Sequence, residues 1–249
     1  MKKLVFDYEM RLSFSAPVTD HRFQLRCIPS TGPRQQVIDV EVKIQPETEL
    51  ETTIDSFDSV VMTGFIPEPH DIFSYSVTGI AFVDNAHIHK EAYKPLYRFN
   101  SALTIPGPNV EAMIAVCRER LAALPSDATP VQQAAEVMDE VYKALAQRKG
   151  VCQDYAHVML SVCRHVGLTA RYIAGLLGGE GATHAWVEVY QDGRWVGLDP
   201  THNRLVDDSY ITIAHGRDYR DCMLDIGIFS GYNVQQSQWV NASVHEQVA

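Results

Sequence analysis

Hydrophobic and polar residues alternate in short runs through the first third of the chain, which is the pattern of half-buried β-strands. β-Branched and aromatic residues are frequent in these runs, and Pro17 and later prolines and glycines interrupt them. The segments that we expect to be strands are Leu4-Val5-Phe6, Phe23 to Ile28, Val37 to Ile44, Ser59 to Met62 and Ser74 to Val77. The pattern predicts an N-terminal antiparallel β domain of the sandwich type over residues 1–90.

The period becomes helical after residue 108. Residues 91–108 contain three prolines and a glycine and are typical of a linker. Apolar residues then recur every three or four positions from Val110 to Leu121 and from Val131 to Leu145. This period predicts two helices, the second with Pro130 in its first turn and continuing to Arg148. We expect a second domain over residues 109–249 and an α+β fold.

A third helix is predicted to begin at Cys152. Ala156, Met159, Leu160 and Cys163 have the i, i+3, i+4, i+7 spacing of one helical face, and Cys152 lies one turn before Ala156 on that face. The free N–H groups and the positive dipole end of a helix stabilise a thiolate, so a cysteine there can titrate well below its free value of about 8.5. Cys152 is therefore a candidate nucleophile.

A hairpin then brings a histidine and a carboxylate together. Residues 186–190 alternate as a strand does, and Asp192-Gly193 is the strongest two-residue hairpin signal in the chain. The register that this turn sets pairs Gln191 with Arg194, Tyr190 with Trp195, Glu188 with Gly197, Trp186 with Asp199 and His184 with Thr201. His184 and Asp199 are then diagonal neighbours on one face, roughly 7–8 Å apart at the backbone. Glu188 shares the face but lies roughly 13 Å along the strand, so the register selects Asp199 as the partner of His184.

Each of these residues also has a structural interpretation. A lone cysteine is most often a small buried apolar residue, and a lone histidine in a strand is most often structural. Nucleophile, base and orienting carboxylate recur together as one geometric unit, however, and this favours the catalytic interpretation. His157 lies about 140° around the helix from Cys152, so we expect it to support the structure and not to act as the base.

Three segments occur in order over residues 150–203, namely GVCQDYAHVMLSVCRHVGLTARYIAGLL, THAWVEVY and WVGLDPTHN. Together they resemble the bacterial transglutaminase-like family within the papain-like superfamily. The earlier HRFQLRCIPSTGPRQQV and FIPEPHDIFSYSV are similar to the β-rich region that precedes the catalytic domain in this family. The resemblance implies a helix that carries the cysteine packed on an antiparallel sheet, and the activity of a cysteine protease. Carried over by position, it makes Cys152 the nucleophile, His184 the base and Asp199 the carboxylate.

Composition and charge exclude several other classes of function. The 249 residues carry a formal net charge of −10 and no basic cluster, which disfavours nucleic acid and anionic membranes as partners. Neither a signal peptide nor a run of roughly 20 apolar residues is found, so a cytoplasmic protein is expected. The five cysteines have no paired spacing, which suits a reducing compartment. The oligomeric state stays open.

We expect no cofactor and no metal. A zinc site built from Cys152, His157, Cys163 and His165 fails because those side chains point in different directions around the helix. His70, His87 and His89 form a weak candidate without a further ligand at fixed spacing.

The chemistry that these residues predict is acyl transfer through a thioester. Cys152 attacks an amide carbonyl, His184 takes or holds its proton, and Asp199 fixes the imidazole. We expect the backbone N–H at Cys152 to stabilise the oxyanion that forms on the substrate. Release by water gives a protease or amidase, which we favour, and release by an amine gives a transglutaminase. A binding module that keeps this fold without the chemistry is the alternative from another class.

Overall fold

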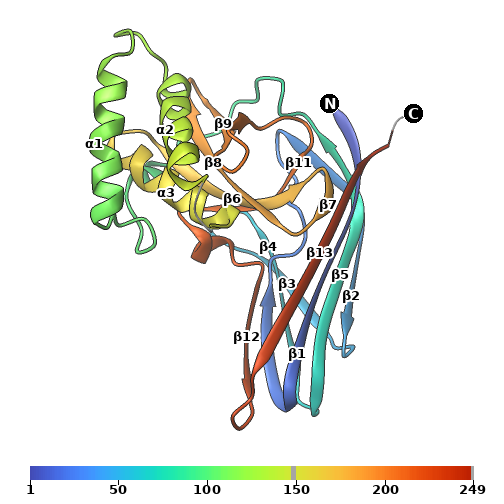
Figure 1. Ribbon diagram of the computed structural model, residues 1–249. Coiled ribbons are helices and arrows are strands. Elements are labelled where there is room, and N and C mark those ends of the chain that lie inside the picture. Colours follow the sequence, from blue (N-terminus) through green and yellow to red (C-terminus); the bar gives the residue numbers. More distant parts are fainter. Residues whose placement is uncertain (147–149, 248–249) are drawn as a thin grey trace.

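The computed structural model describes residues 1–146 and 150–247, and within them the chain forms two antiparallel sheets and a group of helices (Figure 1). The larger sheet contains β1 (Lys2–Leu25), β2 (Gln35–Gln45), β3 (Leu50–Ile54), β4 (Val60–Ile66), β5 (His70–Val83), β7 (Gly179–Gly181), β12 (Asp225–Ser230) and β13 (Gln236–Glu246). The smaller sheet has the order β10-β9-β8-β6-β11. Its strands are β6 (Ala170–Leu177), β8 (His184–Gln191), β9 (Arg194–Asp199), β10 (Arg204–Leu205) and β11 (Tyr210–Gly216). The α+β class predicted from the sequence is confirmed.

Strand β1 is shared by two layers of the larger sheet. Its first half pairs with β5 and β13, and its second half pairs with β4 and β12. The pairing with β5 shifts register between Ser13 and Val18, so Pro17 lies at a bend inside one strand. The sequence pattern predicted separate strands on either side of Pro17, and this detail is wrong because the chain keeps pairing through the bend. The bent strand gives the sandwich-like arrangement of the N-terminal region.

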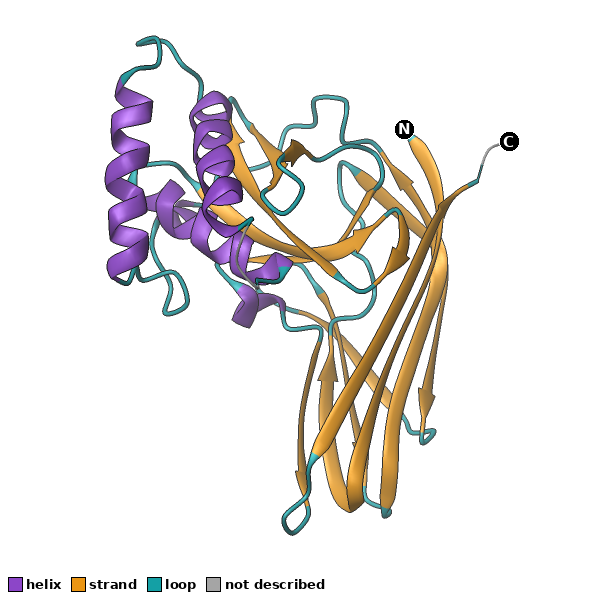
Figure 2. Ribbon diagram, in the orientation of Figure 1, coloured by secondary structure: helices purple, strands orange, loops and turns teal. Residues whose placement is uncertain are grey.

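The larger sheet extends away from the helices as long strands, which Figure 2 shows in orange. Every second residue of the first half of β1 is buried, as the alternation predicts: Leu4, Phe6, Tyr8, Met10, Leu12 and Phe14. At roughly 1.5–3 kcal/mol for each large side chain removed from water, this face contributes much of the stability of the sheet.

The last two strands return to the strands with which the chain begins. After the short helix η2 (Tyr219–Cys222), β12 and β13 hydrogen-bond to β1, and Glu246 lies opposite Leu4. Residues 225–246, which we expected in the second domain, therefore pair with strands of the first. The division into residues 1–90, 91–108 and 109–249 stays a prediction.

Helices α2 (Pro130–Leu145) and α3 (Cys152–His165) cover the smaller sheet, and α1 (Pro108–Ala122) packs on these two helices. The face of α3 that the spacing predicted is buried at Ala156, Met159, Leu160 and Cys163. Helix α2 begins with a capping box between Thr129 and Gln132. The predicted continuation of α2 to Arg148 falls on residues 147–149, outside the described residues. None of the described helices combines the length and the apolar character needed to cross a membrane.

The segment between the β-rich region and α1 packs on the core. It contains the short helix η1 (Pro95–Arg98), and Tyr97 is fully buried. Arg164 of α3 donates from Nε to the Tyr97 carbonyl oxygen over 3.2 Å and from Nη1 to Thr104 Oγ1 over 3.1 Å. These buried bonds hold residues 95–104 against the helix that carries Cys152.

Candidate active site

Cys152 is the first residue of α3, where an extended chain enters the helix. Val151 has φ −100° and ψ 169°, and its N–H donates to Asp154 Oδ2 over 2.8 Å, which fixes the start of the helix. Cys152 is partly exposed, whereas the chain buries Cys27, Cys117, Cys163 and Cys222. Burial raises the pKa of all four buried thiols. Cys152 is therefore the cysteine that a substrate can reach.

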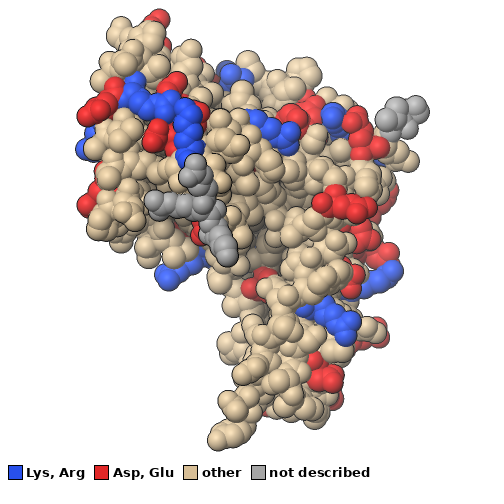
Figure 3. Space-filling view, in the orientation of Figure 1, with Lys and Arg blue, Asp and Glu red and all other residues tan. Residues whose placement is uncertain are grey.

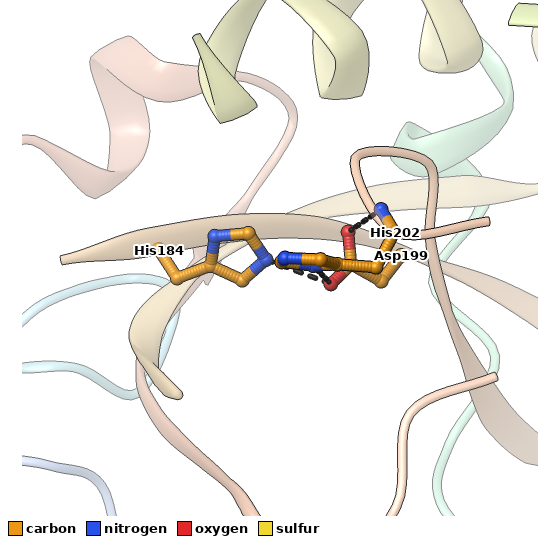
Figure 4. A group of neighbouring side chains, drawn as sticks. All are labelled: His184, Asp199 and His202. Carbon is orange, nitrogen blue, oxygen red and sulfur yellow. Dashed lines mark hydrogen bonds and ion pairs between the residues drawn. The ribbon is translucent and has the colours of Figure 1, made fainter. Parts of the chain in front are cut away.

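His184 links this cysteine to a buried carboxylate. Its Nε2 donates to Asp199 Oδ2 over 2.8 Å (Figure 4). Cys152 lines the same cavity as His184 and contributes to the raised pKa of the ring, and the bond of Nε2 to Asp199 leaves Nδ1 free to face the sulfur. His184 is 8% exposed and Asp199 is fully buried, so the ring is held between sulfur and carboxylate with little access for water.

Asp199 is itself fixed by five hydrogen bonds. Besides His184, its Oδ2 accepts from His202 Nδ1 over 2.7 Å and from the Tyr210 hydroxyl over 2.8 Å. Its Oδ1 accepts from the backbone N–H groups of Thr201, at 2.9 Å, and His202, at 3.3 Å. A carboxylate held in this way cannot rotate without breaking several charge-assisted bonds, so it orients the imidazole firmly.

The electrostatics of the pair favour a charged imidazole beside a charged carboxylate. Burial lowers the pKa of His184, but the hydrogen bonds to Asp199 and Cys152 and the charge on Asp199 outweigh it and raise the pKa to about 9. Burial raises the pKa of Asp199, but the bonds from His184, His202 and Tyr210 prevail and hold it well below its usual range. His184 can therefore carry the proton that Cys152 gives up at neutral pH.

Comparison with known proteins agrees with this geometry. Residues 5–81 match the bacterial transglutaminase-like N-terminal region, and residues 106–200 match the transglutaminase-like superfamily. Together the two matches cover more than half of the chain. The chain belongs to the bacterial transglutaminase-like family. The resemblance read from its three motifs is confirmed.

Individual relatives extend the comparison. An uncharacterized protein of Mycobacterium leprae is 28% identical over 88% of this chain and 90% of its own length. The peptide-N(4)-(N-acetyl-beta-glucosaminyl)asparagine amidase of Drosophila melanogaster is 28% identical over 44% of this chain and only 16% of that enzyme. A crystal structure named "Putative Cysteine Protease from Cytophaga hutchinsonii" has a TM-score of 0.72 at 18% identity and covers 100% of this chain and 91% of that one. The whole fold of this transglutaminase-like protein is thus shared with a solved structure.

The hairpin that places His184 and Asp199 has the predicted register. Gln191 pairs with Arg194, Tyr190 with Trp195 and Glu188 with Gly197. Both turn residues, Asp192 and Gly193, have positive φ, of 51° and 82°, as a two-residue hairpin of this type requires. The ladder ends at Val187 and Leu198, so the further pairs expected at Asp199 and Thr201 are not formed. The side chains of His184 and Asp199 therefore contact each other just beyond the last paired residues of the hairpin.

Glu188 does not orient His184. It is buried and accepts from Arg34 Nη1 over 2.7 Å and from Arg171 Nε over 2.7 Å. Glu91 binds the same two arginines, so four charges from distant parts of the chain compensate one another. Its distance along the strand removes Glu188 from the site, as the register predicts.

Sequence reasoning missed part of the support of Asp199. His202 lies in the turn after Asp199, as a residue in this position is expected to, and it also bonds the carboxylate. The spacing of three residues from the carboxylate was the available signal. Tyr210 was not considered. It comes from β11, and no local pattern connects it with residue 199.

His157 and Trp186 have structural contacts beside the site. His157 Nε2 accepts from the Tyr219 backbone N–H over 3.2 Å, and its ring stacks on Tyr172 with centroids 5.1 Å apart. Trp186 is buried, with its ring 6.3 Å from that of His184. Gly175 makes room for it, since a β-carbon there would lie 2.5 Å from the indole. Both aromatic groups hold the elements of the site together.

One group of side chains in the described chain has the spacing of a metal site. The ligand atoms of His184, Asp199 and His202 all lie within 4.8 Å of one another. Both oxygens of Asp199 already accept hydrogen bonds, so an ion would have to displace the bonds that orient His184. The arrangement suits a proton relay better than a metal centre.

A cavity of about 110 Å³ opens beside Cys152 and His184. One wall comes from the core, with Tyr172 and Tyr219. Further lining comes from β1, β12 and β13 of the larger sheet, through Tyr8, Asp225, Gln238 and Val240, and from Leu224 just before β12. The space-filling view shows the surface hollowed where the helical part meets the long strands (Figure 3). The β-rich region therefore forms part of the site.

The glycine run before His184 is held by the larger sheet. This run is Gly178-Gly179-Glu180-Gly181. Residues 179–181 form β7, which pairs with residues 242–244 of β13. The run is a short edge strand that ties the core to the sheet.

Proposed function

We propose that this protein is a thiol hydrolase that cleaves an amide or peptide bond with Cys152, His184 and Asp199. The observation that carries the proposal is the position of one imidazole between a partly exposed sulfur at a helix start and a buried carboxylate with five hydrogen bonds. Nucleophile, base and orienting group in this relation are the unit used by thiol enzymes. The Drosophila relative is named as an amidase, which is the same reaction class.

The reaction has two halves. Cys152 passes its proton to His184, and the thiolate attacks the carbonyl carbon to form a tetrahedral oxyanion, which the free N–H of the first helical turn can stabilise. The imidazolium then gives its proton to the leaving amine, the C–N bond breaks, and a thioester remains. Water attacks the thioester with His184 as base, which releases a carboxylic acid and restores the thiol.

A transglutaminase is the second candidate, because the same thioester can be attacked by a primary amine. We favour hydrolysis since water is far more abundant around the protein than any amine. The two outcomes differ in mass. A peptide amide incubated with enzyme and a primary amine gives the free acid by hydrolysis and the alkylated amide by transfer, and mass spectrometry separates them.

The test of the thiol mechanism uses matched variants. Cys152→Ala and His184→Ala should each abolish turnover of a peptide amide, and Cys152→Ala should abolish labelling by iodoacetamide at the reactive position. Cys117→Ala and His245→Ala are the controls, because Cys117 is buried in α1 and His245 is exposed on β13. Undiminished turnover in Cys152→Ala or His184→Ala refutes the assignment. Slow alkylation of Cys152, as in a free thiol, would favour a non-catalytic binding module.

A further inference from the structure

The cavity beside Cys152 contains a carboxylate that the proposed reaction does not use. Asp225 is the first residue of β12, directly after the chain leaves the core, and it is half-buried and lines the same cavity as His184. Among the residues that line this cavity it is the one carboxylate. Its position follows from the pairing of β12 with β1, in which Asp225 lies opposite Leu25.

Asp225 has polar neighbours but no cation beside it in the described chain. Gln238 Nε2 donates to its two oxygens over 3.2 and 3.4 Å. Burial raises the pKa of Asp225, and the bond from Gln238 offsets this only in part. Tyr8 and Tyr219 line the same cavity, and after burial itself the charge on Asp225 contributes to the raised pKa of both. A half-buried carboxylate in this setting gains free energy when a positive group enters.

We propose that Asp225 selects the substrate by binding a cationic group, an ammonium or guanidinium, that the acyl donor carries into the cavity beside Cys152. This inference rests on the proposed function, because it names the substrate class of the same site. The net charge of −10 attracts cationic peptides toward the protein as a whole. A cavity of about 110 Å³ is smaller than the engineered cavity of about 150 Å³ that holds a benzene molecule, so it fits the end of one side chain or one terminal amine.

The charge belongs on the acyl donor and not on an attacking amine. A carboxylate stabilises the protonated form of an amine, and an ammonium has no lone pair with which to attack a thioester. Asp225 therefore fits recognition of a basic group in the donor. A basic side chain and a free N-terminus both supply such a group, and the test separates them.

The first experiment measures recognition without turnover. Cys152 is alkylated with N-(2-aminoethyl)chloroacetamide, which is cationic at pH 7, and with N-propylchloroacetamide, which has nearly the same shape and is neutral. The rate for each probe is divided by the rate at which the same probe alkylates a neutral small-molecule thiol, which removes the intrinsic reactivity of the probe. We expect the cationic probe to react on the order of fivefold to tenfold faster, as a partly buried ion pair allows. The preference should fall to about one in Asp225→Asn.

The matched control is Asp39→Asn, which removes the same charge from an exposed position with positive φ on β2, away from the cavity. It should keep the preference of the unaltered protein. Denaturation midpoints of both variants show whether the fold is retained. An equal rate for both probes in the unaltered protein, or a preference that survives in Asp225→Asn, overturns the inference.

The second experiment uses pairs of peptide amides that differ only in lysine or norleucine, each with a free or an acetylated N-terminus. A higher kcat/KM for lysine in the acetylated pair identifies a side-chain site, and a loss on acetylation identifies an N-terminal site. Either preference must disappear in Asp225→Asn. Turnover without any preference for charge sinks the inference and leaves the hydrolase proposal intact. If no peptide amide is turned over but the cationic probe still reacts faster, the hydrolase proposal is refuted and the cation site remains supported.

Discussion

The Tyr210 hydroxyl and Asp199 Oδ2 lie 2.8 Å apart, although β6 and β8 separate their strands in the sheet. The bond joins the start of β11 to the end of β9 and reaches the carboxylate that orients His184. The same hydroxyl accepts from Arg204 Nε over 2.8 Å. This bond polarises the hydroxyl and strengthens the bond that it donates to Asp199. A residue far from the nucleophile in the sequence thus supports the base.

Replacing Tyr210 with Phe should destabilise the protein and weaken the site. The change removes one hydrogen bond to a buried carboxylate, which is worth about 1.5–3 kcal/mol. Chemical denaturation should detect a loss of this size, and kcat/KM should fall less than in Asp199→Asn, since four bonds to Asp199 remain. Tyr232→Phe, at a residue that is 96% exposed, is the control and should be neutral. Equal stability of both variants would contradict the role given to Tyr210.

The activity should decline as pH rises through about 9. The pKa of His184 is raised to about 9, so the imidazolium that donates to the leaving amine is present below this pH and lost above it. Asp199→Asn removes much of what raises this pKa, so the alkaline limb should move toward the ordinary value of about 6.5. We expect kcat/KM at pH 8 to fall on the order of 10²-fold or more. A pH–rate profile checks both effects, and an unmoved limb would show that His184 is not the titrating group.

The buried charges around Glu188 should matter for stability and not for chemistry. Glu188→Gln removes a negative charge that compensates the buried guanidinium groups of Arg34 and Arg171, which lowers the stability by about 3–5 kcal/mol. The free energy of unfolding in urea measures this loss. Glu51→Gln, on the exposed face of β3, is the matched control and should change it by less than about 0.5 kcal/mol. A large loss of kcat/KM in folded Glu188→Gln would argue against the separation of this network from the site.

The pair of His21 and His70 should make the β-rich region sensitive to acid. The rings stack 5.3 Å apart, and His21 Nδ1 lies 3.1 Å from His70 Nε2. Burial, and then the charge of His70, lowers the pKa of His21 to about 4. The unfolded chain binds this proton near pH 6.5 and the folded chain does not, so stability falls as pH drops from about 6.5 to 4 and levels off below.

The expected size of this loss is about 2–3 kcal/mol. Urea denaturation of the unaltered protein and of His21→Phe at pH 7 and pH 4.5 measures it. The variant should lose less stability between the two pH values, because its phenyl ring takes no proton in either state. An identical drop in both proteins would assign the acid sensitivity to other groups.

Local patterns predicted much of the fold and of the site. The spacing that begins at Cys152 identified α3 and its buried face, and the Asp192-Gly193 turn set a register that the strands keep from Gln191 to Glu188. Both signals come from neighbours in the sequence, where side-chain period and turn chemistry act directly.

What the sequence left open depends on contacts between distant segments. The bond from Tyr210 to Asp199 and the pairing of β7 with β13 join residues that share no period or turn. The continuation of β1 through Pro17 was missed, because a proline signals a break in a strand but does not tell whether pairing resumes on the other side. The part of the cavity lining that comes from the larger sheet could not be predicted either, because β12 and β13 are far from β1 in the sequence and lie beside it only in the folded chain.

The return of β13 to β1 closes the fold on itself, with Glu246 opposite Leu4 and the two strands side by side (Figure 1). A fragment that starts after the N-terminal strands would keep Cys152, His184 and Asp199 yet leave β12 and β13 without their partner. It would therefore lose the side of the cleft that holds Asp225 and present two bare strand edges to solvent. A linker from residue 247 to residue 3, with the chain opened in an exposed loop, would keep the pairing of β12 and β13 with β1, so such a circularly permuted protein should tolerate what the truncated one cannot.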